Sequence, residues 1–384
     1  MAHAAARAQL MPASAEEAAA ALRDAAAARI RGGGTKLGWG LPVDAAAELG
    51  TGRLDALLAH NVGDQTAVLQ AGVPLARAQA AFAAAGQMLA LDPPDGGATV
   101  GGVVATGDSG PLRHRYGAPR DLVLGVQVAL PDGSVARAGS QVIKNVAGYD
   151  LAKLMSGAFG TLGLLTEVTV RLHPLPSGTC TAVGRGAEPQ AVARAAGALA
   201  HLPLEADALD VRWDGAAGGA AAGTVLARFG GRSGRDRAEL AARALRDAGL
   251  ECEAVDDDAA LWAAQRDGQR GTAVLRVSTT QDRLGALLAA ARDERALLVA
   301  RAACGLAWLT LPDGDPAALA ALVARLRAAL SPAPCVLLDA PAALRRAVDP
   351  WGPVPAPQLE LMRRVKERFD PERHCNPGLF VGGI

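Results

Sequence analysis

Three glycine-rich stretches, far apart along the chain, constrain its fold more than any other feature. They read RIRGGGTKLG at residues 29–38, DPPDGGATVGGVVATGDSGPLRHRYG at residues 92–117 and GTLG at residues 160–163. Glycine has no Cβ, so its backbone can lie close to another backbone or to a bulky ligand. Any one stretch also fits an ordinary turn. Three of them, each beside an apolar strand candidate, favour one site to which all contribute.

The third stretch is followed by LLTEVTVRL, in which the side chains alternate in character. A period of two predicts a half-buried strand. DLAKLM at residues 150–155 predicts a short helix before the turn. One predicted face of the strand carries Leu164, Thr166, Val168, Val170 and Leu172, and the other carries Leu165, Glu167, Thr169 and Arg171.

Other elements of the first half follow from local signals. Ser14 stands three residues before Glu17, a capping box that predicts a helix ending at about Ala28. A strand is predicted at residues 67–71 and a helix, with proline at its start, at residues 74–85. Strands at residues 121–130 and 135–138 are predicted to form a hairpin, because Pro-Asp-Gly between them is turn chemistry.

From about residue 179 to residue 340, predicted strands alternate with predicted helices, which indicates an α+β or α/β layer. Spacing alone allows either a parallel or an antiparallel sheet. Asp256, Asp257 and Asp258 are expected in a solvated loop, and no histidine near them suggests a metal site. The predicted strands are residues 208–213, 224–229, 272–278, 308–311 and 335–338, and the predicted helices are residues 235–248, 281–292 and 316–330.

The C-terminal region carries one further amphipathic segment, at residues 358–369. Leu359, Met362, Val365 and Phe369 fall on one stripe of a predicted helix, with charged residues outside it. Asp370-Pro371 ends that helix, and Asn376-Pro377-Gly378 predicts a turn beyond it.

Composition excludes several classes of protein. A chain of 384 residues fits two domains, and its 39 basic and 39 acidic residues give no case for nucleic acid or an anionic membrane. Charge or glycine interrupts every apolar stretch before bilayer length, and Glu16, Glu17 and Arg23 argue against a signal peptide. Five scattered cysteines without a Cys-x-x-Cys predict reduced thiols in the cytoplasm, with no iron–sulfur cluster in this chain.

The first glycine stretch has the features of an anion site. Consecutive glycines expose successive N–H groups, and Lys36 could add positive charge. The spacing of a Walker motif is absent. A Rossmann fingerprint after a full strand is absent too, so a nicotinamide domain is not predicted.

Together the three stretches resemble the FAD-binding half of the vanillyl-alcohol oxidase-like flavoproteins, with a PCMH-type FAD-binding domain. The FDP…NPG pattern near the C-terminus resembles the tail of that family. The resemblance implies an α+β fold: a two-subdomain FAD-binding domain at residues 1–176 and an α+β cap with an antiparallel sheet at residues 177–345. Residues 346–384 would pack back on the FAD domain.

The same resemblance implies FAD as cofactor. The first stretch would hold the pyrophosphate, the second, longer loop would cover pyrophosphate and flavin, and GTLG would lie by the isoalloxazine. The implied cofactor-binding residues are Arg31, Gly32, Gly33, Gly34, Thr35, Lys36, Pro93, Thr99, Val100, Gly101, Gly102, Thr106, Gly107, Ser109, Gly110, Tyr116, Gly160, Thr161, Gly163, Leu164, Leu165 and Asn376.

Within that superfamily, KNVAGYDLAKLM, GTLGLLTEV and GQMLALDPPDGGATVGGVVATGDSGP are most similar to the smaller FAD-binding (E) subunits of bacterial glycolate oxidase. The resemblance implies oxidation of glycolate, a small 2-hydroxy acid, to glyoxylate, beside a larger FAD-binding subunit and an iron–sulfur subunit. Attachment to the inner membrane would come only through those partners. Two alternatives are a self-sufficient FAD-dependent oxidoreductase for a hydroxy acid or alcohol, and an assembly subunit with a vestigial FAD groove.

Two departures from the family pattern matter. Relatives with covalent FAD have histidine just after the first stretch, where this chain has Thr35 and Lys36, so FAD is expected to be non-covalent. The His-x-Gly-Asp-Gly-Asn-x-His metal and substrate motif of relatives that oxidise lactate or glycolate directly is also absent. No metal is therefore predicted, and the hydroxy-acid site need not lie in this chain.

Oxidation of a 2-hydroxy acid requires a cation for its carboxylate and a base near its hydroxyl group. Nothing in the sequence ranks the candidates, so the catalytic residues stay open. The candidate cations are Arg113, Arg115 and Arg120, and the candidate bases are His114, Tyr149 and Lys144.

Overall fold

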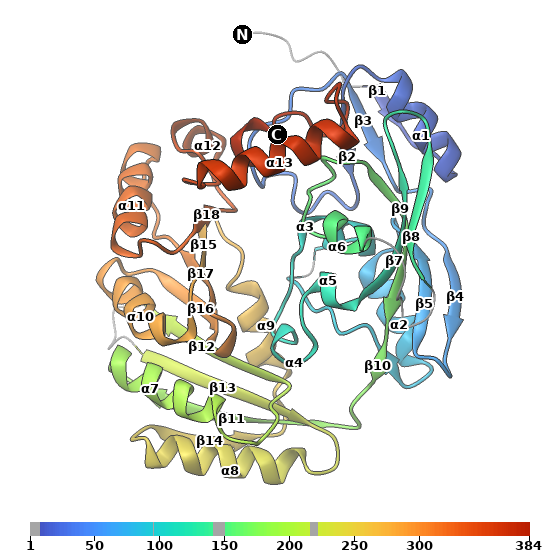
Figure 1. Ribbon diagram of the computed structural model, residues 1–384. Helices are drawn as coiled ribbons and strands as arrows, with labels where there is room; N and C mark the ends of the chain where they lie inside the picture. Colours follow the sequence, from blue (N-terminus) through green and yellow to red (C-terminus); the bar gives the residue numbers. More distant parts are fainter. Residues whose placement is uncertain (1–7, 95, 141–149, 216–221) are drawn as a thin grey trace.

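The computed structural model describes residues 8–94, 96–140, 150–215 and 222–384. Two larger sheets face each other across the molecule, and a helix near the C-terminus lies across the junction between them (Figure 1). The chain has the mixed α and β architecture that the sequence predicts. None of the described helices is both long and apolar enough to cross a membrane.

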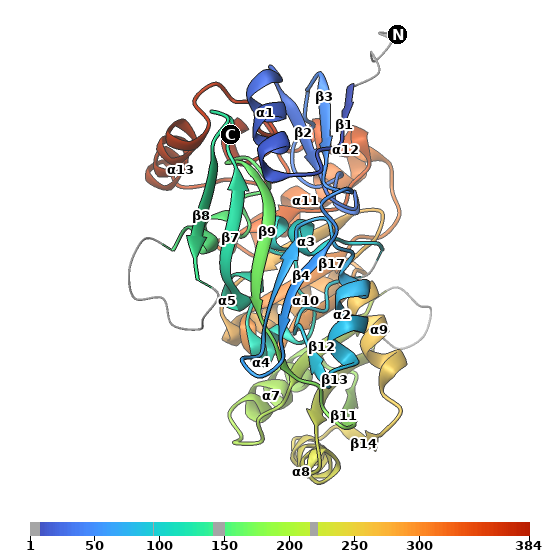
Figure 2. The same ribbon diagram turned by 90° about the vertical axis from the view of Figure 1, so that its right-hand side faces the viewer.

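The first half contains a small parallel sheet and a five-stranded antiparallel sheet (Figure 2). The small sheet has the order β1–β3–β2, with β1 Ala8–Leu10, β2 Ala28–Arg31 and β3 Ala47–Gly50. The larger sheet has the order β4–β5–β9–β7–β8, with β4 Leu57–Asn61, β5 Thr66–Gln70, β7 Val123–Ala129, β8 Val135–Gly139 and β9 Leu164–Arg171. A third, two-stranded pairing joins β6 Gln87–Met88 to β10 His173–Pro174.

The helices of the first half are short. Ser14 caps α1 as predicted, but the helix ends at Asp24, because Ala25 is extended and Ala28 already begins β2. Residues Asp121 and Leu122 belong to a helical turn rather than to the predicted strand, since Pro119 starts the turn and Asp121 Oδ2 accepts from Ala118 N–H at 2.8 Å. The helices are α1 Ala15–Asp24, α2 Leu75–Ala83, α3 Val100–Thr106, α4 Arg113–Tyr116, α5 Pro119–Leu122 and α6 Leu151–Met155.

Strand β9 confirms the predicted strand but corrects its two faces. Gln127 pairs with Glu167 and Val128 pairs with Leu165, so Thr166 is the extra residue of a bulge. The bulge reverses the alternation, and Leu165 packs in the same core as Val168 and Val170. Leu164 instead packs in the core beneath α1, so the strand is covered on both sides rather than half-buried.

The second half forms one eight-stranded sheet in which every pair is antiparallel, as the family resemblance implies. Its order is β14–β11–β13–β12–β16–β17–β15–β18. The predicted strands appear as β12 Ala208–Asp214, β13 Ala222–Gly230, β15 Val274–Ser278, β17 Leu306–Thr310 and β18 Cys335–Leu337, joined by β11 Thr179–Gly186, β14 Glu251–Val255 and β16 Leu297–Arg301, which were not predicted.

Helices cover mainly the outer face of this sheet (Figure 1), and their apolar sides form its largest core. The predicted helices appear as α8 Gly234–Asp247, α10 Leu284–Asp293 and α11 Pro316–Ala329, and the sequence missed α7 Pro189–Ala200, α9 Ala259–Asp267 and α12 Ala342–Ala347. Asp258, expected in a solvated loop, is instead 3% exposed. It is paired with Arg228 at 3.0 Å and accepts from the Thr181 hydroxyl at 2.8 Å.

Helix α13 Ala356–Phe369 carries the predicted apolar stripe. Leu359 and Met362 pack on a cluster shared by the two halves, and Val365 and Phe369 pack on the core of the five-stranded sheet. The helix therefore ties the end of the chain to the first half. We keep the division of the chain at residues 176 and 345 as a proposal.

Candidate functional site

A deep cavity lies where the three glycine-rich stretches meet. It encloses about 970 Å³, counting the part that opens to solvent, and Gly33, Gly101 and Gly160 all line it. Residues more than a hundred positions apart therefore surround one cleft, as the glycine pattern predicts. A cavity of this size and lining is typical of a cofactor site.

Most of the residues proposed for FAD lie at this cavity. Those that line it are Arg31, Gly32, Gly33, Gly34, Thr35, Lys36, Thr99, Gly101, Gly102, Thr106, Gly160, Gly163, Leu164, Leu165 and Asn376. The structure places others outside its lining: Pro93, Val100, Gly107, Ser109, Gly110, Tyr116 and Thr161. Val100 and Thr161, for example, are 0% and 2% exposed and are covered by other parts of the chain.

Several lining residues were not foreseen. Those next to the glycines, such as Ala98 and Phe159, could have been included from sequence proximity alone. Thr51, Ala71 and Leu379 lie outside all three stretches, so no local signal marks them. The unforeseen lining residues are Arg29, Ile30, Leu37, Trp39, Val43, Thr51, Ala71, Ala98, Ala105, Met155, Ala158, Phe159, Leu162 and Leu379.

The glycines are needed where segments of the site touch. A Cβ on Gly33 would lie 2.0 Å from Gly97 O, and one on Gly101 would lie 2.5 Å from Ala71 Cβ. A Cβ on Gly32 would lie 2.4 Å from Thr99 Oγ1. These contacts leave no room for a side chain, so the stretches can stack only as glycine. The backbone-lined surface that results fits a dinucleotide.

The second stretch is partly helical, whereas the sequence predicts a loop. Helix α3 starts after Thr99, whose hydroxyl accepts from Gly102 N–H at 3.2 Å. It ends at Gly107, which has φ of 65°, a left-handed C-cap that favours glycine. Gly101 and Gly102 therefore present a helix surface to the cavity.

The C-terminal segment closes the site from behind. Asn376 is 3% exposed, and its Oδ1 accepts from Ile30 N–H at 2.8 Å while its Nδ2 donates to Phe159 O at 2.7 Å. It thus joins the strand before the first glycine stretch to the turn before the third. Nearby, Lys366 Nζ donates to Thr161 O at 2.7 Å and pairs with Asp370 at 2.6 Å.

The positive charges of the first stretch already have partners. Lys36 Nζ lies 3.1 Å from Asp108 Oδ2, and the two side chains are 5% and 4% exposed. Arg31 pairs with Glu48 at 3.0 Å. Lys36 therefore reaches the cavity as part of a buried ion pair rather than as the isolated cation that the sequence suggested.

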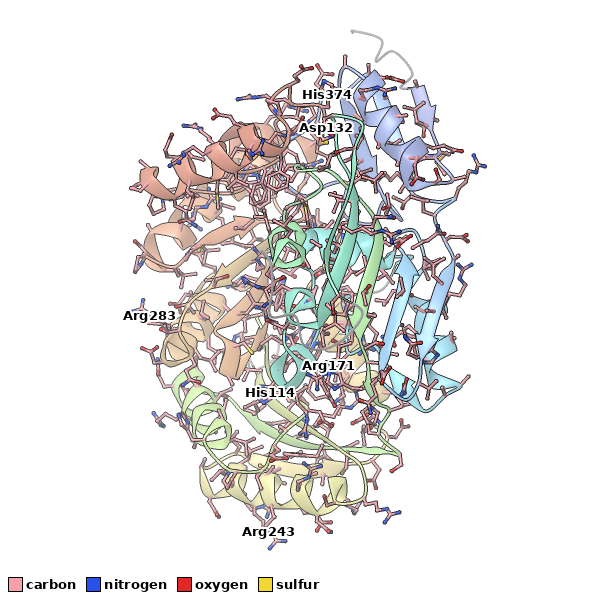
Figure 3. All side chains as sticks on the ribbon, turned by 45° about the vertical axis from the view of Figure 1, so that its right-hand side comes forward. His114, Asp132, Arg171, Arg243, Arg283 and His374 are labelled. Carbon is pink, nitrogen blue, oxygen red and sulfur yellow. The ribbon has the colours of Figure 1, made fainter. Side chains whose placement is uncertain are left out.

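The candidate catalytic residues that the structure describes lie away from this cavity. His114 (Figure 3) lines a separate, smaller cavity of about 360 Å³ with Leu204 and Phe229, where burial lowers its pKa. Arg115 donates to Glu205 O at 2.9 Å and lies 3.4 Å from Asp207 Oδ1. Arg120 is exposed. Tyr149 and Lys144 fall outside the described residues.

Arg276 is a charged residue that sequence reasoning missed. It lies on β15 between apolar neighbours, so nothing in VLRVS marks it. Its Nε is buried without a hydrogen-bond partner. Burial lowers the pKa of its guanidinium, Asp108 raises that pKa and Arg113 lowers it. Arg113 itself donates to Ser109 Oγ at 3.3 Å, so two arginines lie near the Lys36–Asp108 pair.

Residues 6–139 match the FAD binding domain family. The match supports an FAD-binding domain in the first part of the chain. The prediction of FAD as cofactor is thereby confirmed, and its non-covalent attachment stays a prediction.

Curated relatives match parts of the chain. Glycolate oxidase subunit GlcE of Escherichia coli (strain K12) is 49% identical over 107 residues, which is 27% of this chain and 31% of the relative. D-lactate dehydrogenase [cytochrome], mitochondrial, of Arabidopsis thaliana is 39% identical over 33% of this chain and 22% of that one. Glycolate oxidase subunit GlcD of Bacillus subtilis (strain 168) is 35% identical over 38% of this chain and 32% of the relative. The chain spans about a third or less of each.

Among solved structures, an alkyldihydroxyacetonephosphate synthase has a TM-score of 0.68 and 14% identity. The match covers 96% of this chain and 76% of that one. At this identity the likeness shows the fold alone. It extends over both halves of the chain, including the eight-stranded sheet.

Proposed function

We propose that this chain is the FAD-binding subunit of a glycolate oxidase (glycolate dehydrogenase) complex. Glycolate would be oxidised to glyoxylate, and electrons would pass through flavin to an iron–sulfur partner beside a larger FAD-binding subunit. The observation that carries the proposal is the 49% identity to a glycolate oxidase subunit in a chain whose glycine stretches surround one cavity. The complex would be cytoplasmic, with any membrane attachment made by partners.

The roles of this chain's residues follow from the cavity. FAD, when bound, would supply the redox chemistry, and the protein would supply position and electrostatics. Backbone N–H groups of residues 32–36 and the surface of α3 would hold the dinucleotide. Thr35 and Lys36 stand where covalent relatives have histidine, which supports a non-covalent cofactor.

The redox partners are proposed from what this chain lacks. Among the described residues, no group of histidine, cysteine and carboxylate side chains could hold a metal ion. The five cysteines are all free and spread through the chain, whereas an iron–sulfur cluster needs several thiolates at one place. An electron acceptor with such a cluster would therefore be a separate subunit.

The purified chain tests this function. We expect it to be yellow, to release FAD into the supernatant on acid precipitation, and to reduce no dye with glycolate until the other subunits are added. Pigment retained in the pellet would contradict non-covalent attachment. Turnover by the chain alone would favour the self-sufficient oxidoreductase, and a colourless, stably folded protein would favour the assembly subunit.

Arg276 and Arg113 favour the self-sufficient oxidoreductase as a second candidate. The Arg276 Nε is buried and has no hydrogen-bond partner, although Asp108 interacts electrostatically with the guanidinium. A buried guanidinium N–H without an acceptor is costly, and a small carboxylate would supply one. Arg276 interacts electrostatically with Arg113 and with Asp108. Asp108 is in turn the ion-pair partner of the cavity residue Lys36.

Under this second function, replacing Arg276 with methionine should weaken glycolate binding about 10-fold or more, because one charge-assisted contact is lost. Titration of the flavin spectrum with glycolate measures the change. Arg212→Met is the matched control, since Arg212 is also on the eight-stranded sheet but is paired with Asp214 at 2.9 Å. Equal glycolate affinity in both variants would remove Arg276 from the site.

A further inference from the structure

Residues of the eight-stranded half hold the first glycine stretch from its outer side. Arg270 Nη2 donates to Thr35 O at 3.1 Å. Arg345 Nη1 donates to Gly38 O at 2.7 Å. The indole of Trp39, one residue further along the chain, donates to Asp339 Oδ1 at 2.8 Å. Three contacts from one half of the chain thus converge on a single short loop of the other half.

Arg270 and Asp339 form a two-point ion pair that organises these contacts. Arg270 Nε lies 2.7 Å from Asp339 Oδ2, and its Nη2 lies 3.1 Å from Oδ1. This bidentate geometry fixes the guanidinium plane. The same Nη2 reaches Thr35 O, and the same Oδ1 accepts from Trp39, so one ion pair fixes both a carbonyl and an indole of the loop.

The position of the Thr35 carbonyl determines where the next N–H points. A trans peptide is planar, with C=O and N–H directed to opposite sides. Because Thr35 O faces Arg270, the N–H of Lys36 is turned away from the Arg270 contact. Thr35 and Lys36 both line the cavity. The contact from Arg270 therefore sets the orientation of a peptide group in the part of the loop that we assign to the pyrophosphate.

Aromatic packing makes this arrangement rigid. Trp39 is 2% exposed and packs in one cluster with Phe159, Trp308 and Trp351. Three of the five tryptophans of the chain are in that cluster, although aromatic residues are only 3% of the sequence. Arg270 also lies over the Trp39 ring at 5.6 Å. A loop backed by such a cluster has little freedom to move independently.

We propose that Arg270, Asp339 and Trp39 form a loop clamp that positions the first glycine stretch for FAD. The inference rests on the assignment of FAD to the glycine-lined cavity. Arg270 and Asp339 are positioning residues: they act through Thr35 and the loop backbone and do not line the cavity, whereas Trp39 lines it and is held by Asp339. FAD affinity then depends on residues about 235 to 300 positions away from the loop.

Arg270→Met tests the clamp. We expect the apoprotein of this variant to bind FAD about 10-fold more weakly or worse, because the loop carbonyl loses its charged donor. Quenching of flavin fluorescence on titration with apoprotein measures the dissociation constant. The melting temperature of the apoprotein should fall by only about 2–4 °C, since the Arg270 side chain is 31% exposed. Parental FAD affinity in the folded variant would overturn the proposal.

Matched variants separate positioning from general destabilisation. Arg325→Met removes another bidentate pair of the same half, with Glu294, and should leave FAD affinity unchanged. Trp39→Phe keeps an aromatic side chain but removes the indole N–H that donates to Asp339, together with part of the ring, and it carries the test if Arg270→Met does not fold. Combined, Trp39→Phe and Arg270→Met should weaken FAD by less than the product of their separate effects, because both act through Asp339.

The two levels of the proposal fail in different ways. Absence of FAD binding by the parent protein would contradict the assignment of FAD to the glycine-lined cavity. If the parent binds FAD but Trp39→Phe and Arg270→Met weaken FAD affinity independently, so that their effects multiply, only the clamp is contradicted. Loss of affinity in the Arg325→Met control equal to that in Arg270→Met would also sink the clamp, because it would show a general effect of lost ion pairs.

Discussion

Replacing Gly33 with alanine should weaken FAD binding about 10- to 100-fold, which is the range expected for one overpacked contact. The added Cβ would lie 2.0 Å from Gly97 O and 3.1 Å from Gly97 C. Both are backbone atoms, so no flexible side chain can give way. The first and second glycine stretches must then separate, and the cavity that both line loses its shape. Titration of apoprotein with FAD measures the effect.

Gly63→Ala is the control for this substitution. Gly63 lies in an exposed turn, and a Cβ there would meet nothing within 4 Å. Neither glycine has a positive φ, so the comparison isolates packing from backbone strain. Gly63→Ala should keep parental FAD affinity. If Gly33→Ala also kept it, the close stacking of the two stretches would not matter for the cofactor.

The second large effect is expected at Lys366. Its side chain is 4% exposed, and its Nζ contacts Asp370 at 2.6 Å, Thr161 O at 2.7 Å and Cys375 O at 3.1 Å. Lys366→Met would leave the Asp370 carboxylate buried without its cation, which typically costs about 3–5 kcal/mol of unfolding free energy. Urea denaturation measures the loss, provided that the unfolding free energy of the variant and of the parent falls with urea concentration at the same slope.

Lys153→Met provides the comparison. Lys153 also pairs with an aspartate, Asp150, at 2.8 Å, but the two side chains are 46% and 50% exposed. An exposed pair contributes about 0–1 kcal/mol, so this variant should unfold almost as the parent does. A loss in Lys366→Met as small as that in Lys153→Met would show that the contacts of α13 with the third glycine turn do not anchor the C-terminal segment.

Local signals predicted much of the fold for a definable reason. Helices such as α8 and α11 appear close to where periodicity placed them, because each buries one face that its own sequence marks. Strands such as β5 and β12 appear where short apolar runs placed them, and most of their residues are buried. β14, by contrast, is an edge strand of mixed composition, ECEAV, whose only strand neighbour is β11. Its pairing depends on a strand about seventy residues away, so no local window reveals it.

The alternation in β9 shows where pattern reasoning fails. In a regular strand, alternate side chains lie on the same face. The extra residue of a bulge, here Thr166, shifts this alternation, so residues before and after it change faces. Its hydroxyl donates to Gln127 O at 3.2 Å on the neighbouring strand. The change of face was therefore decided by a partner strand that a reading of residues 164–172 does not include.

The sequence by itself indicated that three glycine-rich stretches would form one site, because absence of side chains is a property of the residues alone. Its resemblance to a flavoprotein family implied that FAD would be the cofactor of that site. The tertiary structure decided which charges remain uncompensated there. Lys36 pairs with Asp108 and Arg115 pairs with Asp207, whereas the Nε of Arg276 is buried without a hydrogen-bond partner. Pairing depends on distances between segments, so a residue's charge could be read from the sequence while its availability to a ligand could not.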